Sequence, residues 1–189
     1  MLNVPVIQFM RRKLLIASIT VVLTLAVTFG VRYRLYAFTI IWHCFHQNTE
    51  EIGGHRLKFP ILWWQEKNED YDTFSFERAS PSNTFPNPEI VVRPALSGVI
   101  PDTNQQVLKS IQILIAARNS HPVPGTSSSL IILNANSFSL YCEKIDTKIV
   151  GMDAANTLFC ETARVPYIFT YDGPPNYEQE AESILLTLE

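Results

Sequence analysis

The sequence lacks the short motifs that mark the common catalytic, cofactor and metal sites. It has no Cys-x-x-Cys pair, which argues against a zinc ribbon, a thioredoxin-type site and haem attachment. It also has no Gly-x-Ser-x-Gly, no His-Glu-x-x-His and no dinucleotide-binding fingerprint. The glycine and serine run at 125–129 lacks the Gly-Lys-Ser/Thr of a phosphate loop, and we expect it to form a turn. The sequence therefore indicates no catalytic residue and no cofactor.

Negative charge is missing from the first part of the chain and in excess in the rest. Residues 1–46 contain five Lys or Arg and no Asp or Glu, whereas residues 47–189 contain ten Lys or Arg and eighteen Asp or Glu. An acidic domain repels phosphate backbones, so we expect no nucleic-acid partner.

Charge is also missing from the longest apolar run, Leu14–Val31. This run holds 18 residues and is flanked by Arg11-Arg12-Lys13 on one side and by Arg32 and Arg34 on the other. At about 1.5 Å per residue it reaches about 27 Å, close to the thickness of a bilayer core. It exceeds the usual signal-peptide core of about 7–15 residues, and no Ala-x-Ala cleavage site closes it. The run predicts one transmembrane helix at 14–32, acting as an uncleaved signal-anchor.

This helix divides the chain into a tail at 1–13, a juxtamembrane segment and linker at 33–54, and a globular domain at 55–189. Basic residues favour the cytoplasmic side, and three precede the helix while two follow it. We therefore predict a cytoplasmic N-terminus and an extracytoplasmic domain, periplasmic in a bacterium. The lipid bilayer is then one expected partner, and an unknown protein is the other.

The segment Tyr33–Phe45 is apolar and rich in aromatic residues. Tyrosine and tryptophan prefer the membrane–water interface. The segment is expected either to extend the helix beyond the bilayer or to lie along its surface.

The chain has three cysteines, and two of them, Cys142 and Cys160, are placed symmetrically about Gly151. If the stretch between them is a hairpin that turns at Gly151, they lie opposite each other and close enough for a disulfide. The alternative is two small buried side chains on paired strands. Cys44 is expected to lie near the membrane, where it is free, lipidated or paired between chains.

The domain alternates between strand-like and helix-like patterns that predict an α+β fold. Short connections exclude parallel crossovers, so we expect an antiparallel sheet of about six or seven strands with two packed helices, in the order β-β-β-α-β-β-β-β-α. Strands are expected at residues 57–59, 73–78, 90–93, 130–133, 138–144, 158–163 and 167–171, and helices at 103–119 and 177–188.

Local signals refine these elements. Thr103 and Gln106 form a capping box for the first helix, whose stripe at 107, 111, 114 and 115 should face the core. Asn176 is the expected cap of the second helix. Residues 47–56 are expected to form a polar linker, and the charged run 66–72 is expected to be exposed.

The domain resembles the PsbP-like and DcrB-like α/β-sandwich families over residues 55–189. The resemblance is carried by the Phe59-Pro60…Trp63 opening, the middle helix, the four strands after it and the closing Glu182-Ser183-Ile184-Leu185-Leu186-Thr187-Leu188. It implies an accessory or assembly protein rather than an enzyme, here with a membrane helix in place of a lipid attachment. It implies no role for any individual residue.

Two functional hypotheses follow. The first is a non-enzymatic, membrane-tethered envelope protein with a binding or assembly domain. On a strand, Trp63 and Trp64 would point to opposite faces. Either one enters the core while the other is exposed and contacts a partner, or both are buried under the proline-rich loop. The second is a membrane-bound enzyme or metal protein with a non-standard site near His43, His46 and His55. His43 and His46 lie three residues apart and would share a helix face, but the set is short of a tetrahedral site.

Overall fold

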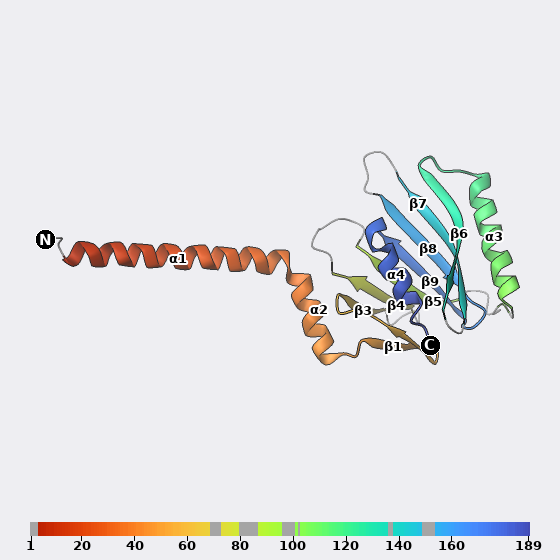
Figure 1. The fold of residues 1–189 in the computed structure, drawn as a ribbon, viewed down its shortest axis with the longest axis horizontal. Helices are drawn as coiled ribbons and strands as arrows, with labels where there is room; N and C mark the ends of the chain where they lie inside the picture. Colours follow the sequence, from red (N-terminus) through yellow and green to blue (C-terminus); the bar gives the residue numbers. More distant parts are fainter. Residues whose placement is uncertain are drawn as a thin grey trace.

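The structure is a computed structural model that describes residues 4–68, 73–79, 87–95, 101, 103–135, 138–148 and 154–189. Two consecutive helices, α1 (Val4–Arg32) and α2 (Arg34–Phe45), precede an α+β domain (Figure 1). The domain begins with a hairpin of β1 (Thr49–Ile52) and β2 (His55–Lys58). A larger sheet follows, formed by β3 (Trp63–Asn68), β4 (Thr73–Arg78), β5 (Glu89–Pro94), β6 (Thr126–Asn134), β7 (Ser139–Thr147), β8 (Ala155–Glu161) and β9 (Tyr167–Gly173).

The larger sheet has seven strands in the order β3-β4-β5-β9-β8-β7-β6, and every neighbouring pair is antiparallel. This confirms the predicted α+β class and antiparallel sheet. Helices α3 (Asn104–Ser120) and α4 (Glu178–Leu185) pack on opposite faces. The consecutive β7 residues Glu143 and Lys144 show this, because Glu143 pairs with Arg118 of α3 and Lys144 with Glu178 of α4.

The hydrophobic core lies between the sheet and α4. Fully buried side chains from β3, β4, β5, β9, β8 and β7 point toward that face, because alternate residues of a strand share one side. Burying each large side chain contributes about 1.5–3 kcal/mol. The main contributors are Trp63, Phe76, Ile90, Tyr171, Phe169, Leu158 and Leu140, with Ala181, Ile184, Leu185 and Leu188 from α4 and the turn after it.

The predicted linker at 47–56 is in large part a hairpin of the fold, and that prediction is wrong. Gly53 and Gly54 form its turn with φ of 57° and 82°, values that favour glycine. A Cβ on Gly53 would lie 2.5 Å from the Tyr167 ring. The hairpin is held in place because Ile52 and Leu57 are buried and because β2 exchanges two main-chain hydrogen bonds with Glu189.

Other local predictions have mixed outcomes. The capping box of Thr103 and Gln106 is present, and Val107 and Ile111 are buried. Leu114 is instead 39% exposed, because α3 covers only the β6–β7 edge of its sheet face. The predicted turn at 125–129 is mostly the start of β6, and β3 extends into the charged run as far as Asn68.

The closing helix begins later than predicted and without the expected cap. A 3-10 turn, η1 (Pro175–Tyr177), precedes α4, so Asn176 lies inside that turn. Tyr177 takes the cap position and makes no side-chain cap hydrogen bond. Pro175 at the first position of η1 accounts for the tighter turn, since its ring fixes φ before the helix starts.

The helices before the domain leave the transmembrane prediction open. Within the part of the chain that the structure describes, no single helix has the length and hydropathy of a membrane span. Ile16–Gly30 and Arg34–Phe45 meet that criterion only together, with a bend of 68° at the break between them.

Candidate functional site

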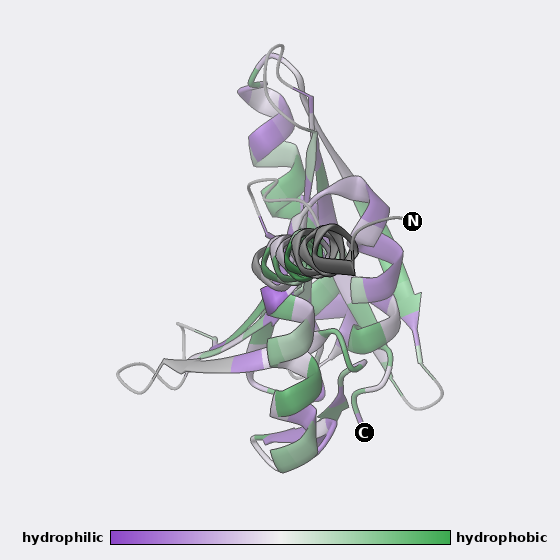
Figure 2. Cartoon of the chain, turned by 90° about the vertical axis from the view of Figure 1, so that its left-hand side faces the viewer, coloured by the Kyte–Doolittle hydropathy of each residue, from purple (hydrophilic) through white to green (hydrophobic). Residues whose placement is uncertain are grey.

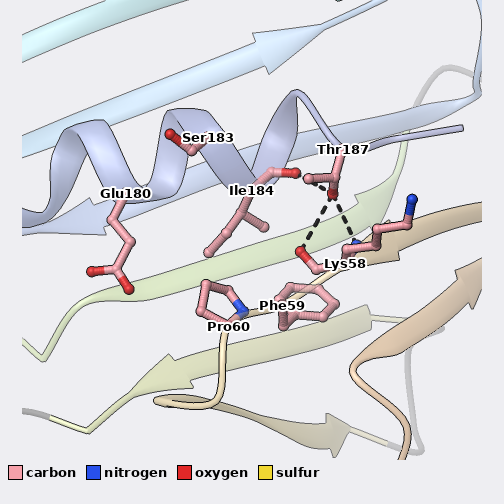
Figure 3. Close-up of a pocket in the computed structure, with 7 residues that line it drawn as sticks. All are labelled: Lys58, Phe59, Pro60, Glu180, Ser183, Ile184 and Thr187. Atoms are coloured by element: carbon pink, nitrogen blue, oxygen red, sulfur yellow. Dashed lines mark hydrogen bonds between the residues drawn. The ribbon is translucent and has the colours of Figure 1, made fainter.

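A groove runs between α4 and the segment that follows β2, and it has a volume of about 330 Å³ (Figure 3). Phe59, Pro60 and Ile184 provide apolar surface, while Ser183 carries a hydroxyl near its rim. Glu180 lies at one end, and Lys58 and Thr187 lie at the other. The groove therefore combines an apolar surface with polar groups at both ends, which is typical of a binding site for a small side chain or ligand.

Hydrogen bonds close the Thr187 end of the groove. The Thr187 hydroxyl accepts from the Lys58 main-chain nitrogen at 2.9 Å and donates to the Ile184 carbonyl at 2.7 Å. The Lys58 ammonium pairs with Glu189 at 2.9 Å, where both side chains are exposed. These contacts hold the residues that follow α4 against β2, and so they hold the two sides of the groove together at this end.

The Glu180 end is held by two donors from the sheet. Trp63 Nε1 donates to Glu180 Oε1 at 3.0 Å, and Arg78 Nε donates to Oε2 at 2.7 Å. The Arg78 guanidinium also lies 4.1 Å from the centre of the Tyr177 ring, a cation–π distance. Each carboxylate oxygen of Glu180 therefore accepts a hydrogen bond from a buried or nearly buried donor.

Glu178 lies two residues before Glu180, about half a helical turn away, and bonds to other strands of the sheet. Its side chain is 10% exposed, pairs with Lys144 Nζ at 2.5 Å and accepts from Asn156 Nδ2. The bond to Glu178 raises the pKa of Lys144. Burial, together with the nearby Glu178 charge, raises the pKa of Glu182.

The acidic residues of α4 are the main feature that the sequence analysis missed. No role was predicted for Glu178 or Glu180, whereas both bond to sheet residues. A signal was available for Glu178, because it lies three residues before Ala181 and seven before Leu185, on the apolar stripe itself. No comparable pattern identified Arg78 as the partner of Glu180.

The polar side chains that line the groove are already engaged with other groups of the protein. The Ser183 hydroxyl donates to the Gln179 carbonyl at 2.8 Å. A serine nucleophile needs an adjacent general base, and the groove-lining residues include no histidine or cysteine. Their two acidic and basic side chains, Glu180 and Lys58, are both engaged in ion pairs.

Trp63 and Trp64 point to opposite faces of β3, as predicted for adjacent strand residues. Trp63 is fully buried in the core. Trp64 is 8% exposed and lies edge-to-face against Phe38 of α2, with ring centres 5.8 Å apart. Trp64, which was a candidate for contact with a partner protein, is therefore covered by α2 of the same chain.

The histidines of the alternative site make separate contacts. His43 Nε2 lies 2.7 Å from the Trp63 carbonyl oxygen, and His46 Nδ1 lies 2.9 Å from the Trp42 carbonyl oxygen. His55 is in β2. Among the described residues no three His, Cys, Asp or Glu side chains are placed to share a metal ion.

Cys142 and Cys160 are opposite each other on β7 and β8, in the register that the sequence predicted. The structure joins them in a disulfide with a Cα–Cα distance of 4.1 Å. The predicted turn at Gly151 lies outside the described residues. Cys44 is an exposed free thiol.

Comparisons with known proteins bear on the fold alone. No protein-family model matches the sequence, and no curated protein matches it. The chain is similar to cyanobacterial PsbP. The solution structure of PsbP (CyanoP) from Synechocystis sp. PCC 6803 shares 12% sequence identity and a TM-score of 0.44, covering 75% of this chain and 90% of that one. This similarity agrees with the predicted resemblance to PsbP-like domains, and it transfers no residue and no activity to this chain.

Proposed function

We propose that this chain is a single-pass membrane protein whose α+β domain is a non-enzymatic binding or assembly module on the extracytoplasmic side. The observation that carries the proposal is the uncharged run Leu14–Val31 between basic residues. Such a run matches the length of a bilayer core and the charge pattern of a span.

The disulfide supports the extracytoplasmic side. Cys142 and Cys160 are both fully buried and bonded in the core. Structural disulfides persist in oxidising compartments and are rare where glutathione and thioredoxin keep thiols reduced. The excess of basic residues before the apolar run favours the same orientation.

The groove under α4 supports the binding role. Pro60 is exposed at the groove, while Glu180, the carboxylate that lines it, already accepts two hydrogen bonds. A partner that inserts an apolar side chain between Ile184 and Pro60 would bury surface without breaking those bonds.

Protease accessibility tests the location. The full chain, tagged at its C-terminus, is expressed in cells stripped of the outer wall and treated with protease before and after permeabilisation. We expect digestion of the domain without permeabilisation, while a cytoplasmic control protein stays intact. Protection of the domain until permeabilisation would overturn the proposed orientation.

A photo-crosslinking amino acid at exposed Ser183 tests the groove. We expect a discrete adduct in the cells where the protein occurs, and none from the same amino acid at exposed Ser129 of β6. Equal adducts from both positions, or none from Ser183, would contradict binding at the groove.

A further inference from the structure

Helix α2 has one face against the domain and one apolar face left open. Thr39 is fully buried, and Leu35, Tyr36, Trp42 and His43 are partly buried at the helical spacing of a single face. The other face carries apolar side chains with large exposed fractions, 58% for Ile41 and 82% for Phe45. Ala37, Ile40 and Cys44 are exposed with them.

The docked face is held by specific contacts, so α2 forms part of the domain surface. His43 Nε2 lies within hydrogen-bond distance of the Trp63 carbonyl oxygen at the start of β3. Phe38 packs edge-to-face on Trp64 of the same strand, with ring centres 5.8 Å apart. The open apolar face therefore keeps a constant orientation relative to the sheet.

The position of α1 indicates what covers the open face. α1 leaves α2 on the side opposite to the domain (Figure 1). The two helices are bent by 68°, so α2 lies nearer to the membrane plane than to its normal when α1 follows the normal. Figure 2, which looks along α1, shows α2 running below it with most turns coloured as hydrophobic.

We infer that α2 is an interfacial helix whose apolar face, formed by Ala37, Ile40, Ile41, Cys44 and Phe45, enters the boundary between headgroups and acyl chains. The inference rests on the proposed anchoring by α1. An interfacial helix usually has a polar face toward water; here the domain occupies that side. α2 contains no Asp or Glu, and Arg34 at its start suits anionic headgroups.

Contact of α2 with the bilayer would hold the domain in one orientation relative to the membrane. Because α2 contacts β3, that edge of the sheet faces the membrane while the β6 edge, at the far end of the strand order, points away from it. The surface around β6 is then presented to the surrounding compartment.

Cys44 allows a direct test. With Cys142 and Cys160 bonded, it is the thiol available to a label in the non-reduced chain. The full chain is labelled with an environment-sensitive nitrobenzoxadiazole dye and reconstituted in vesicles of phosphatidylcholine and phosphatidylglycerol. We expect quenching by lipids that carry a nitroxide high on the acyl chain, and protection from iodide in water. The matched control, Cys44→Ser combined with Ser129→Cys, should show the reverse.

Vesicle flotation separates this inference from the proposed anchoring. A chain that fails to float refutes the anchor. A chain that floats but carries an iodide-accessible label at Cys44 refutes the interfacial helix alone. A label shielded from both quenchers, with self-quenching that rises with protein density, assigns the face to a second copy and also overturns the inference.

Charge substitution on the open face gives an independent test. Phe45→Asp or Ile41→Asp should leave flotation and far-UV circular dichroism unchanged, because both side chains are exposed in the fold. Either variant should raise iodide quenching of the Cys44 label several-fold. The matched change Ile113→Asp, on an exposed position of α3, should leave the label protected. Equal quenching in the Phe45 and Ile113 variants would contradict the inference.

Discussion

The Trp63 indole nitrogen donates a hydrogen bond to the Glu180 carboxylate at 3.0 Å, and this bond joins β3 to α4. The same carboxylate accepts from Arg78, whose side chain is 11% exposed. One acidic residue of the helix therefore satisfies two donors at the border between the core and the groove. An unpaired donor at such a position costs free energy because water cannot replace the lost partner.

Glu180→Ala should lower the free energy of unfolding by about 1–3 kcal/mol, since it leaves the Trp63 indole nitrogen and the Arg78 Nε without their acceptor. Glu180→Gln should cost less, because the amide oxygen can still accept from Trp63. Urea unfolding of the full chain in detergent, followed by far-UV circular dichroism, measures both. The control is Gln179→Ala at an exposed position of the same helix. Equal losses for the Ala and Gln variants of Glu180 would contradict this role.

The ion pair between Lys144 and Glu178 is expected to show coupling. Lys144→Met leaves a nearly buried carboxylate without its cation and should cost about 3 kcal/mol. The double variant Lys144→Met with Glu178→Gln should recover part of that loss, because no unpaired charge remains. A double-mutant cycle on the same unfolding curves gives the coupling energy. Strictly additive losses would argue that the two side chains act independently.

Stability at neutral pH should rise in Glu161→Gln. Burial raises the pKa of Glu161, so the folded state holds its proton more strongly than the unfolded chain. Its contribution is fully present below about pH 4.3, the ordinary glutamate value, and is lost as pH rises through the folded pKa. Glu161→Gln has no carboxyl group to ionise at this position, so we expect it to have a higher free energy of unfolding than the wild type at pH 7. This difference should disappear as the pH falls toward 4.

Unfolding midpoints measured between pH 4 and pH 8 test this prediction. Glu51→Gln, at an exposed position of β1, is the matched control and should follow the wild type throughout. A constant difference between the Glu161 variant and the wild type across this range would contradict the assigned cause.

Removal of the disulfide should lower stability without changing the fold. The two cysteines are 18 residues apart, and closing a loop of that size stabilises by about 3 kcal/mol in the chain-entropy description. Cys142→Ala with Cys160→Ala should show that loss in urea, whereas Cys44→Ser should not. Mass spectrometry after alkylation without reductant gives a second readout. We expect one alkylated thiol, and three would contradict the bond.

Most of the order of elements in the domain was predictable, because most elements carry a local signal. Thr103 and Gln106 marked the start of α3, and alternation in Thr73–Arg78 marked β4. The symmetric spacing about Gly151 correctly predicted that Cys142 and Cys160 are opposite each other. β1 and β3 were not predicted, whereas the expected strand at 57–59 overlaps β2. β1 is short and polar, and only Ile52 of it is buried.

The candidate site was less predictable, because its contacts join residues far apart in the chain. Glu180 meets Trp63 and Arg78 across separations of 117 and 102 residues. Neither partner stands out in the sequence, since buried tryptophans and strand arginines are common. Trp64, a tryptophan that the sequence allowed to be exposed, is instead covered by Phe38 of α2. No local sequence pattern indicated that α2 packs on the domain.

Local periodicity and composition were enough to predict the antiparallel α+β domain, the long apolar run before it and the facing cysteines. These properties depend on residues near each other in the chain, or on a register set by a single hairpin. The tertiary structure alone decided which carboxylates of α4 are buried, where the groove lies and which face of α2 stays open. These depend on how α4 and α2 pack against the sheet, and packing brings together side chains that share no local signal.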